Sequence, residues 1–419
     1  MDLFIFHRDL RIEDNTSLIN CILTNGNCTP IFIFTPEQID DNKYFSERAY
    51  NFMVESLYEL KEKIKQLKGK LYFFKGDNIK VLKEIHKHNK INSISFNLDY
   101  SPYAKERDNS IIEWCQNTGI KTNINEDYSL YPVIGSKQYK VFTPFKNYCL
   151  KNYKVRKPNY IVPEFKLANI KNKYSVSING KANHREEAVA IMEKYKSGPS
   201  HLSAYIHFGL ISIREVYYKI KDERVRSELH WRDFYYNMVY HNENLLGGMV
   251  GKTNKPNKEE IKWSYNKTKF KLWCDGMTGF PIVDAFMRQL NSDGTMDNRG
   301  RMIVASFLCK DLHIDWRMGE QYFATKLKDY DPISNNQGWM WVASVGTDAS
   351  PWFRIFNPWI QSVKFDPDCN YIKKWVPEVS KFDCKRIHRW DKYHDDKYKP
   401  MLDHDIEKTK ALKLYKAIN

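Results

Sequence analysis

The chain between Met296 and Pro358 reads MDNRGRMIVASFLCKDLHIDWRMGEQYFATKLKDYDPISNNQGWMWVASVGTDASPWFRIFNP, and it is the most informative part of the sequence. It contains Trp316, Trp339, Trp341 and Trp352, together with arginines, asparagines and acidic residues. Any single tryptophan could belong to a hydrophobic core. Large rings mixed with polar groups usually line a pocket for a flat ligand that forms hydrogen bonds. The window therefore predicts a ligand site.

Helical patterns surround this window and extend over the second half of the chain. Apolar residues recur there with the period of an amphipathic α-helix, and strand patterns are missing. We therefore expect an all-helical domain over residues 187–419. Its clearest helical segments are Val216–Lys221, Glu228–His241, Ile282–Leu290, Arg301–His313, Glu320–Lys328 and Asp405–Asn419.

The first 130 residues show a different pattern, in which short β-rich runs alternate with helical stretches such as Ser46–Leu67 and Pro102–Thr118. Strands that recur after helical segments form right-handed βαβ crossovers and a buried parallel sheet. We expect a Rossmann-like α/β domain with a parallel five-stranded sheet over residues 1–130, although neither a GxGxxG fingerprint nor a P-loop occurs. The expected strands are Leu3–Phe6, Ile31–Phe34, Leu71–Phe74, Ile94–Phe96 and Thr122–Ile124.

A lysine-rich segment separates the two patterns. Residues 131–186 are broken by prolines and show little periodicity, which is typical of a long surface connector. The expected organisation is an α/β domain (1–130), a connector (131–186) and a helical domain (187–419).

The 419-residue chain is strongly basic, with 66 Lys and Arg against 51 Asp and Glu and a net charge of +15. A field of this sign favours encounters with polyanions, above all nucleic acid. No run of about 18 apolar residues occurs, so we expect no membrane span, and the charged N-terminal run argues against a secretory signal peptide. The eight cysteines form no CxxC pair, which fits a reducing compartment. We expect a soluble intracellular protein and no metal site.

Several motifs stand out along the chain. They are FHRDLRIEDN (6–15), SGPSHLSAYIHFGLIS (197–212), ELHWRDFYYNMV (228–239), WCDGMTGFPIVDAFMRQL (273–290), DNRGRMIVASFLCKDLHIDWR (297–317) and DYDPISNNQGWMWVASVGTDA (329–349). In this order they resemble the photolyase/cryptochrome family over nearly the whole chain. The resemblance implies an antenna-type α/β domain joined to a helical domain that holds FAD in a deep cavity.

The resemblance also implies the cofactor contacts. Arg301 and Asp329 correspond to a buried ion pair next to the flavin, and Asp331 would face its pyrimidine edge or ribityl chain. Asn335 falls where the family contacts flavin N5, and a neutral amide there tolerates a reduced anionic flavin, the form expected to be active. The pyrophosphate would bind near the start of a predicted helix, where free N–H groups and hydroxyls suit phosphate. The residues expected there are Tyr195, Ser200, His201, Leu202 and Ser203.

Two further sets of residues follow from the same resemblance. Trp263, Trp316 and Trp339 match a chain of three tryptophans that leads electrons from the surface to the flavin. Glu228, Asn298 and Met302 match catalytic residues of the branch that repairs cyclobutane pyrimidine dimers. Glu228, if buried and protonated, would donate a hydrogen bond to the thymine carbonyls. The expected DNA contacts are Trp231, Arg232, Arg299, Trp341, Arg354 and Gln361.

Asn298 and Met302 discriminate between activities, because the branch that repairs (6-4) photoproducts usually has histidines at both positions. The resemblance therefore implies a carbon–carbon lyase that repairs cyclobutane dimers in double-stranded DNA with light. A cryptochrome-type blue-light photoreceptor and a DASH-type or (6-4) photolyase are the alternatives. Ser101–Asp108 lies near the family's site for an antenna pigment, and these residues do not choose between a folate, a deazaflavin or none. We expect a monomer.

Overall fold

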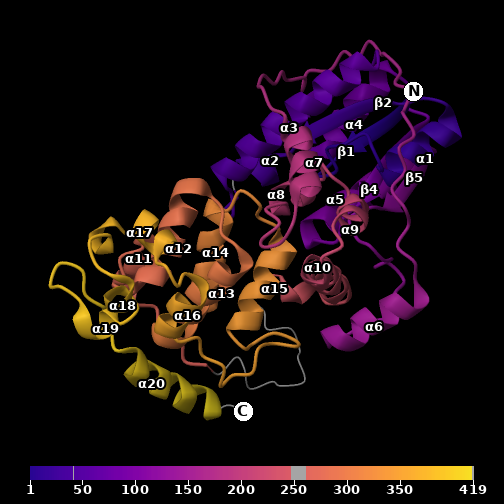
Figure 1. Cartoon of the computed structure of the whole chain (residues 1–419). Coiled ribbons are helices and arrows are strands. Elements are labelled where there is room, and N and C mark those ends of the chain that lie inside the picture. The colour runs from indigo at the N-terminus through magenta and orange to yellow at the C-terminus, as the bar shows by residue number, and fades with distance from the viewer. Residues whose placement is uncertain (41, 247–260, 418–419) are drawn as a thin grey trace. The chain divides into compact units, whose positions relative to one another are not determined.

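The computed structural model describes residues 1–40, 42–246 and 261–417. They belong to two compact units, Met1–Leu246 and Gly247–Asn419 (Figure 1). Each unit buries its own set of apolar side chains. Among the described residues, every helix is too short or too polar to span a lipid bilayer.

The first unit is built on a five-stranded sheet with the order β3-β2-β1-β4-β5, in which all neighbouring strands run parallel. Leu3 of the central strand lies opposite Thr29 on one side and Ile94 on the other. Central strands that are buried on both faces are typical of α/β proteins. The predicted α/β class and the five predicted strands are confirmed. The strands are β1 (Asp2–Phe6), β2 (Thr29–Phe34), β3 (Tyr72–Lys75), β4 (Ser93–Leu98) and β5 (Lys121–Glu126).

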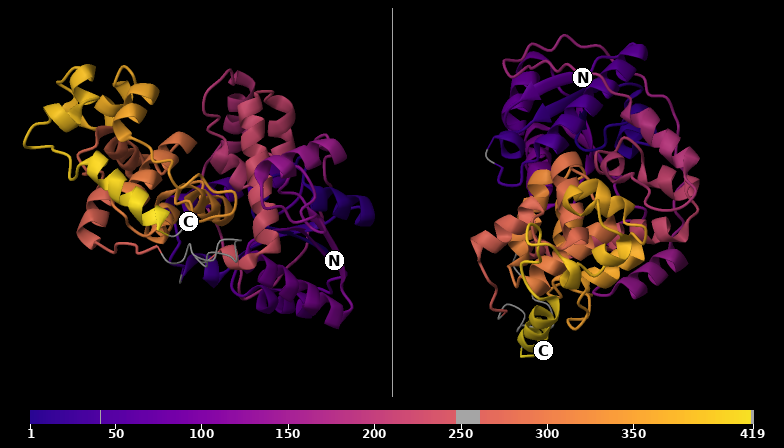
Figure 2. Two further views of the ribbon diagram at one scale, coloured as in Figure 1. Left: turned by 90° about the horizontal axis from the view of Figure 1, so that it is seen from below. Right: turned by 60° about the vertical axis from the view of Figure 1, so that its left-hand side comes forward.

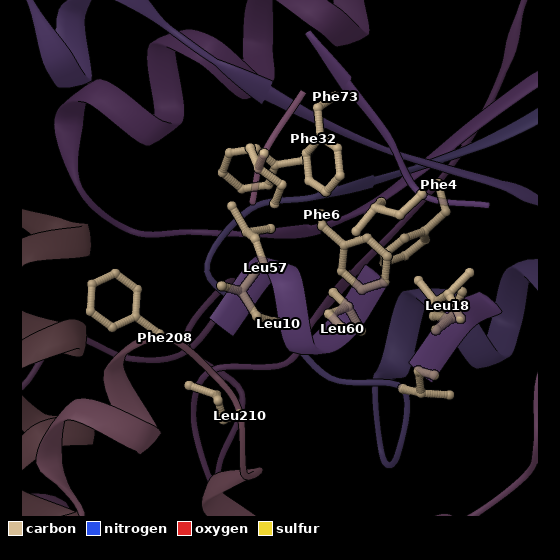
Figure 3. Packing of buried hydrophobic residues seen from close by; sticks show 14 of the residues in the cluster. Phe4, Phe6, Leu10, Leu18, Phe32, Leu57, Leu60, Phe73, Phe208 and Leu210 are labelled. Atoms are coloured by element: carbon tan, nitrogen blue, oxygen red, sulfur yellow. The ribbon is translucent and has the colours of Figure 1, made fainter. Parts of the chain in front are cut away.

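Helices cover both faces of this sheet. Successive side chains of a strand point to opposite faces, so each strand packs against helices on both sides. Phe4 and Phe6 of β1 pack with α1 and α3, in the cluster that Figure 3 shows from close by. Leu3 and Ile5 point to the opposite face and pack with α4 and α5. The four helices are α1 (Thr16–Asn25), α3 (Glu47–Gln66), α4 (Asn78–His88) and α5 (Pro102–Thr118).

The first unit continues with helices beyond the sheet. They are α6 (Phe142–Asn152), α7 (His184–Lys194), α8 (Ser203–His207), α9 (Ile213–Lys219) and α10 (Glu223–His241), and α2 (Pro36–Ile39) and the 3-10 turn η1 (Glu243–Leu245) complete the unit. The segment predicted to be a connector thus contains α6, whose buried Phe145 and Cys149 form an apolar stripe. The lysines around these two residues hide the stripe in the sequence.

Helices dominate the described part of the second unit, residues 261–417, as predicted. They are α11 (Lys267–Asp275), α12 (Pro281–Asp293), α13 (Asn298–Ser306), α14 (Trp316–Lys326), α15 (Pro332–Val342), α16 (Pro358–Phe365), α17 (Asn370–Trp375), α18 (Cys384–Ile387), α19 (Trp390–Tyr393) and α20 (His404–Lys416), with a short 3-10 turn η4 (Pro377–Val379). The helix predicted over Arg301–His313 is wrong in one respect, because it passes into a π-helical turn, η3 (Phe307–Asp311). The last helix of the described residues is α20, drawn in yellow near the C-terminus (Figures 1 and 2).

Candidate active site

Arg301 of α13 forms an ion pair with Asp329, which lies just before α15. Its Nη2 donates to Asp329 Oδ2 at 2.6 Å, and its Nε donates to the carbonyl oxygen of Met296 at 2.8 Å. The Asp329 side chain is 4% exposed. Its second oxygen, Oδ1, is buried and has no hydrogen-bond partner among the described residues. Because a buried oxygen without a partner is costly, Oδ1 is a candidate contact for a bound donor.

Asp331 and Asn335 occupy the first turn of α15. Asp331 caps the helix, since it accepts a hydrogen bond from the backbone N–H of Ser334 at 2.7 Å. The amide Nδ2 of Asn335 donates to the carbonyl oxygen of Glu320 at 3.1 Å and to its carboxylate Oε1 at 3.0 Å. Glu320 thereby occupies the donor end of the amide. The oxygen Oδ1 is left as the acceptor that Asn335 can offer a ligand.

Trp339 lies on α15, where it is 3% exposed. Its ring makes an edge-to-face contact with Phe323 of α14, at 5.0 Å between centroids. A Cβ atom on Gly319 of α14 would lie only 2.2 Å from the Trp339 ring. The close approach of the two helices, and with it the burial of the indole, therefore requires a glycine at this position.

The other two tryptophans of the predicted chain lie on neighbouring segments of the same unit. Trp316 opens α14 and is 1% exposed, and its Nε1 has no hydrogen-bond partner among the described residues. Trp263 is half-buried, and the next residue, Ser264, donates its N–H to the carbonyl oxygen of His313 at 2.7 Å. This hydrogen bond joins the segment that contains Trp263 to the segment that leads into α14. Their role as electron carriers stays a prediction.

The predicted catalytic residues Asn298 and Met302 lie one helical turn apart on α13, with Asn298 exposed and Met302 half-buried. Arg299, between them, holds its guanidinium over the ring of Phe365, 4.7 Å from the centroid. This cation–π contact keeps the arginine on an aromatic support at the protein surface.

Three further residues predicted to contact DNA belong to the second unit. Trp341 of α15 is half-buried, and Arg354 is exposed. Gln361 of α16 has a buried Oε1 without a hydrogen-bond partner among the described residues. Their contacts with DNA stay predictions.

Helix α10 of the first unit carries the remaining predicted substrate residues. Glu228 is exposed, and its role as a hydrogen-bond donor to the dimer stays a prediction. Trp231 stacks flat on Phe142 of α6, with ring centroids 3.9 Å apart and an interplanar angle of 9°. Arg232 donates from Nη1 to the carbonyl oxygen of Tyr128. The sequence offered no sign of the Phe142 stack, because the two rings are far apart along the chain.

The predicted pyrophosphate motif leads into α8. Ser203 is the first residue of this short helix, and no side chain among the described residues caps its N-terminus. Ser203 and His201 are exposed, whereas Leu202 is buried and Ser200 is half-buried. The hydroxyl of Tyr195 contacts the carbonyl oxygen of Gly198 at 3.0 Å and thereby holds the preceding loop.

Comparison with known proteins identifies the family of this chain. A family model described as the FAD binding domain of DNA photolyase matches residues 225–417, and a second one, described as DNA photolyase, matches residues 3–164. A deoxyribodipyrimidine photo-lyase of Buchnera aphidicola is 32% identical over 99% of this chain and 98% of its own. One from Escherichia coli is 31% identical over 98% of both chains. The chain belongs to the DNA photolyase family.

Solved structures agree with the fold of this photolyase. An archaeal photolyase from Sulfolobus tokodaii that contains two FAD molecules aligns with a TM-score of 0.90 and 36% identity over 100% of both chains. A cryptochrome from Synechocystis, 24% identical, aligns with a TM-score of 0.86 over 99% of both chains and shows the shared fold alone.

The residues of the photolyase fit an FAD cofactor. Asp329 Oδ1 and Asn335 Oδ1 are acceptors, and the Arg301 guanidinium is a donor, as the edge of an isoalloxazine ring requires. In the first unit, taken by itself, the N-terminus of α8 has no side-chain cap among the described residues, and its N–H groups are of the kind that suits a phosphate. The predicted FAD-binding domain is confirmed by the family match, and each residue's contact with FAD stays a proposal.

A second polar cluster of the photolyase lies at the carboxyl ends of β1 and β4, where the order of the sheet reverses and α/β proteins bind ligands. Both ring nitrogens of His7 are buried there without a hydrogen-bond partner among the described residues. Burial and the nearby Arg107 lower the pKa of His7, so its imidazole is neutral. Arg8 forms two hydrogen bonds with the carboxylate of Asp99, at 2.6 and 2.7 Å. The sequence pointed to the neighbouring Ser101–Asp108 and missed His7, which can be found only once β1 and β4 are known to be neighbours.

Proposed function

We propose that this protein is a deoxyribodipyrimidine photo-lyase that repairs cyclobutane pyrimidine dimers in DNA with light. The relatives from Buchnera and Escherichia coli have that name. The observation that carries the proposal is α13, which directs Arg301 to Asp329 and also presents Asn298 and Met302. One helix thus supplies both a flavin contact and the residues expected at the dimer.

The flavin would be held by Arg301, Asp329, Asp331 and Asn335. When bound and reduced, FAD supplies the light-driven electron that opens the dimer and that is returned afterwards. The Arg301–Asp329 pair orients the ring, and the partnered side chains cannot rotate without losing their hydrogen bonds. Asn335, fixed by Glu320, places a neutral carbonyl oxygen in the site and adds no negative charge.

The dimer would be turned out of the duplex, which costs a few kcal/mol and least for a damaged pair. Trp231 can contribute to its binding, because Phe142 occupies one face of the indole and holds it in place for a base on the other. Stacking on an aromatic ring is worth about 1–3 kcal/mol per base. Arg354 is exposed and free to reach a phosphate, and Asn298 offers an amide to a pyrimidine edge.

The purified protein should be tested by absorbance and then by illumination with three oligonucleotides. One contains a cyclobutane dimer, one a (6-4) photoproduct, and one is undamaged. We expect bound FAD and loss of the cyclobutane dimer under blue light, with no loss in darkness. Bound FAD without loss of either lesion would favour a photoreceptor, and loss of the (6-4) product would favour that branch; either result contradicts the proposal.

We also propose that a second chromophore binds beside His7, at the carboxyl ends of β1 and β4. The unpartnered nitrogens of His7 and the following Ser101–Asp108 segment support this position. The archaeal relative with two FAD molecules makes a flavin a candidate beside a folate or a deazaflavin.

Quantifying chromophores released from the protein tests this second site. His7→Phe is expected to reduce the second chromophore while about one FAD per chain remains. Asp40→Asn, an exposed surface change, is the control and should retain both. A single chromophore in the unmodified protein, or an unchanged pair in His7→Phe, contradicts the assignment.

A further inference from the structure

Two cysteines, a histidine and a serine of the second unit form a cluster that none of the predicted FAD or DNA residues joins. We call Ser362, Cys369, Cys384 and His388 the thiol cluster. Cys369 Sγ lies 3.4 Å from His388 Nε2, and His388 Nδ1 lies 2.7 Å from Ser362 Oγ. Cys384 is the first residue of α18 and lies one helical turn before His388, and, besides burial, its nearby thiol raises the pKa of the Cys369 thiol. Residues of α16, α17 and α18 thus converge on one thiol pair.

The backbone holds Cys369 in position. Its φ angle is 52°, in the left-handed region that non-glycine residues rarely adopt and that persists only when the surroundings impose it. Its N–H donates to the carbonyl oxygen of Asp366 at 2.9 Å. The Asp366 carboxylate in turn accepts from the N–H groups of Tyr371, at 3.1 Å, and Ile372, at 2.8 Å. The backbone around Cys369 is therefore already ordered before its thiol reacts.

The two thiols differ in access to solvent. Cys369 is buried, and burial raises the pKa of its thiol, whereas Cys384 is partly exposed. A reagent in solution therefore reaches Cys384 first and leaves Cys369 to react second. No group of three or more histidine, cysteine or acidic side chains suited to a metal occurs among the described residues. The cluster thus favours thiol chemistry over metal binding.

A second thiol pair provides an internal comparison. In the first unit, the neighbouring Cys28 thiol is the main cause that lowers the pKa of Cys21 to about 7. Both side chains have 0% exposure. This pair has proximity and an acidic thiol but lacks a route for a reagent, since a reactive cysteine must also be accessible.

We propose that Cys369 and Cys384 are a redox-active pair that is oxidised to an intramolecular disulfide by a low-molecular-weight disulfide such as oxidised glutathione. The Cys384 thiolate attacks one sulfur of glutathione disulfide, and the first glutathione leaves with the proton lost by Cys384. Cys369 then attacks Cys384 Sγ, and the second glutathione leaves with the proton lost by Cys369. His388 Nε2, 3.1 Å from the carbonyl oxygen of Pro367, keeps its hydrogen. Two protein thiols are oxidised, and one disulfide is reduced to two thiols.

The new bond would close the segment between the two cysteines, which contains α17 and the 3-10 turn η4 (Pro377–Val379). A cross-link over a loop of this length limits the unfolded chain and raises the Tm by roughly 5–10 °C. Oxidation would thereby fasten the start of α18 to the start of α17, which follows α16, the helix that carries Gln361 and Ser362.

The full-length, FAD-loaded protein should be incubated with oxidised glutathione and analysed by thiol titration and peptide mass spectrometry. We expect two of the eight thiols to be lost, a Cys369–Cys384 linkage, and reversal by dithiothreitol. A Cys21–Cys28 linkage formed first would overturn the proposal. So would a stable glutathione adduct on Cys384 of the unmodified protein.

Two variants separate the steps. Cys369→Ser should trap the glutathione adduct on Cys384, because the second thiol is missing. Cys384→Ser should lose no thiol pair under the same conditions, whereas the control Cys21→Ser should behave as the unmodified protein does. Equal protection by Cys21→Ser and Cys384→Ser would show that the thiol cluster is not the site.

Discussion

The side-chain amide of Asn335 is held in one orientation by its hydrogen bonds. Both hydrogen bonds to Glu320 use Nδ2, so the protein itself determines that the carbonyl oxygen remains for a ligand. The residue type alone offers a donor and an acceptor equally. A partner on the preceding helix removes that ambiguity.

At the residue scale, Gly319 controls the burial of Trp339. Gly319→Ala would place a methyl group 2.2 Å from the indole, so we expect a loss of about 1–3 kcal/mol in the free energy of unfolding and slower photoreduction of bound FAD. Gly338→Ala is the control, because a Cβ there meets nothing within 4 Å. It should be neutral or stabilising by up to about 1 kcal/mol. Urea unfolding and FAD absorbance under light compare the two variants, and equal effects would show that the contact is unimportant.

Trp339 is also predicted to be the tryptophan that passes electrons to the oxidised cofactor. Trp339→Phe keeps an aromatic ring in the space bounded by Phe323 but is much harder to oxidise. We expect photoreduction of FAD to fail while repair by chemically reduced protein continues. Trp341→Phe, two residues later on the same helix, should retain photoreduction. Unchanged photoreduction in Trp339→Phe would remove this residue from the electron route.

At the scale of elements, an ion-pair network joins α1, α9 and the end of β5. Asp127 follows β5 and accepts hydrogen bonds from Arg11, from Arg214 Nη2 at 2.6 Å and from the Thr16 hydroxyl at 2.5 Å. Burial alone would raise the pKa of Asp127, but the charges of Arg11 and Arg214 outweigh it and hold this pKa well below its usual range. The network thus fastens a helix to the sheet through charges that are shielded from water.

The pH dependence of unfolding tests this network. Because the pKa of Asp127 is lower in the folded state, its contribution is present above the unfolded value of about 3.9 and is lost as the pH falls towards the folded value. Asp127→Asn should lower the free energy of unfolding by about 3–5 kcal/mol at pH 7, since two buried guanidinium groups lose a charged partner and, among the described residues, only Arg214 keeps another, Asp14 at 2.7 Å. The same substitution should also make the free energy of unfolding fall less steeply as the pH is lowered.

Asp40→Asn is the matched control, because Asp40 pairs with Lys75 at the surface, where both side chains are 47% exposed. Asp40→Asn should change the free energy of unfolding by less than about 1 kcal/mol. Urea unfolding at pH 7 and at about pH 2.5, well below the unfolded pKa of Asp127, gives the cost of each substitution and its dependence on pH. A similar cost for the two variants would mean that the buried network adds nothing.

At the scale of the whole molecule, the net charge of +15 should make DNA affinity fall steeply with salt. Each phosphate contact contributes a slope of about 0.9 in a plot of log affinity against log salt. Arg354→Gln should therefore reduce the slope by about one, because the exposed guanidinium is predicted to bind a phosphate. Lys65→Gln on α3, where the ammonium is 74% exposed and pairs with Glu62, should leave the slope unchanged. An unchanged slope in Arg354→Gln would exclude that contact.

The sequence by itself determined the classes of structure and the family. Strand and helix periods are local properties, so the five strands, the α/β domain and most helices could be predicted from spacing alone. The motifs identified the FAD-binding domain because their residue types and order are unusual together. Helix α6, which lies in a lysine-rich segment, and the π-turn after α13 were missed, since neither changes the local period clearly.

Only the tertiary structure decided which side chains meet. The hydrogen bonds from Asn335 to Glu320, the stack of Phe142 on Trp231 and the pairing of Cys369 with Cys384 join residues from different elements. Glu228 is exposed for the same reason, because burial depends on what packs against a helix and not on the helix itself. Spacing along the chain specifies the face of an element, and packing specifies its neighbours.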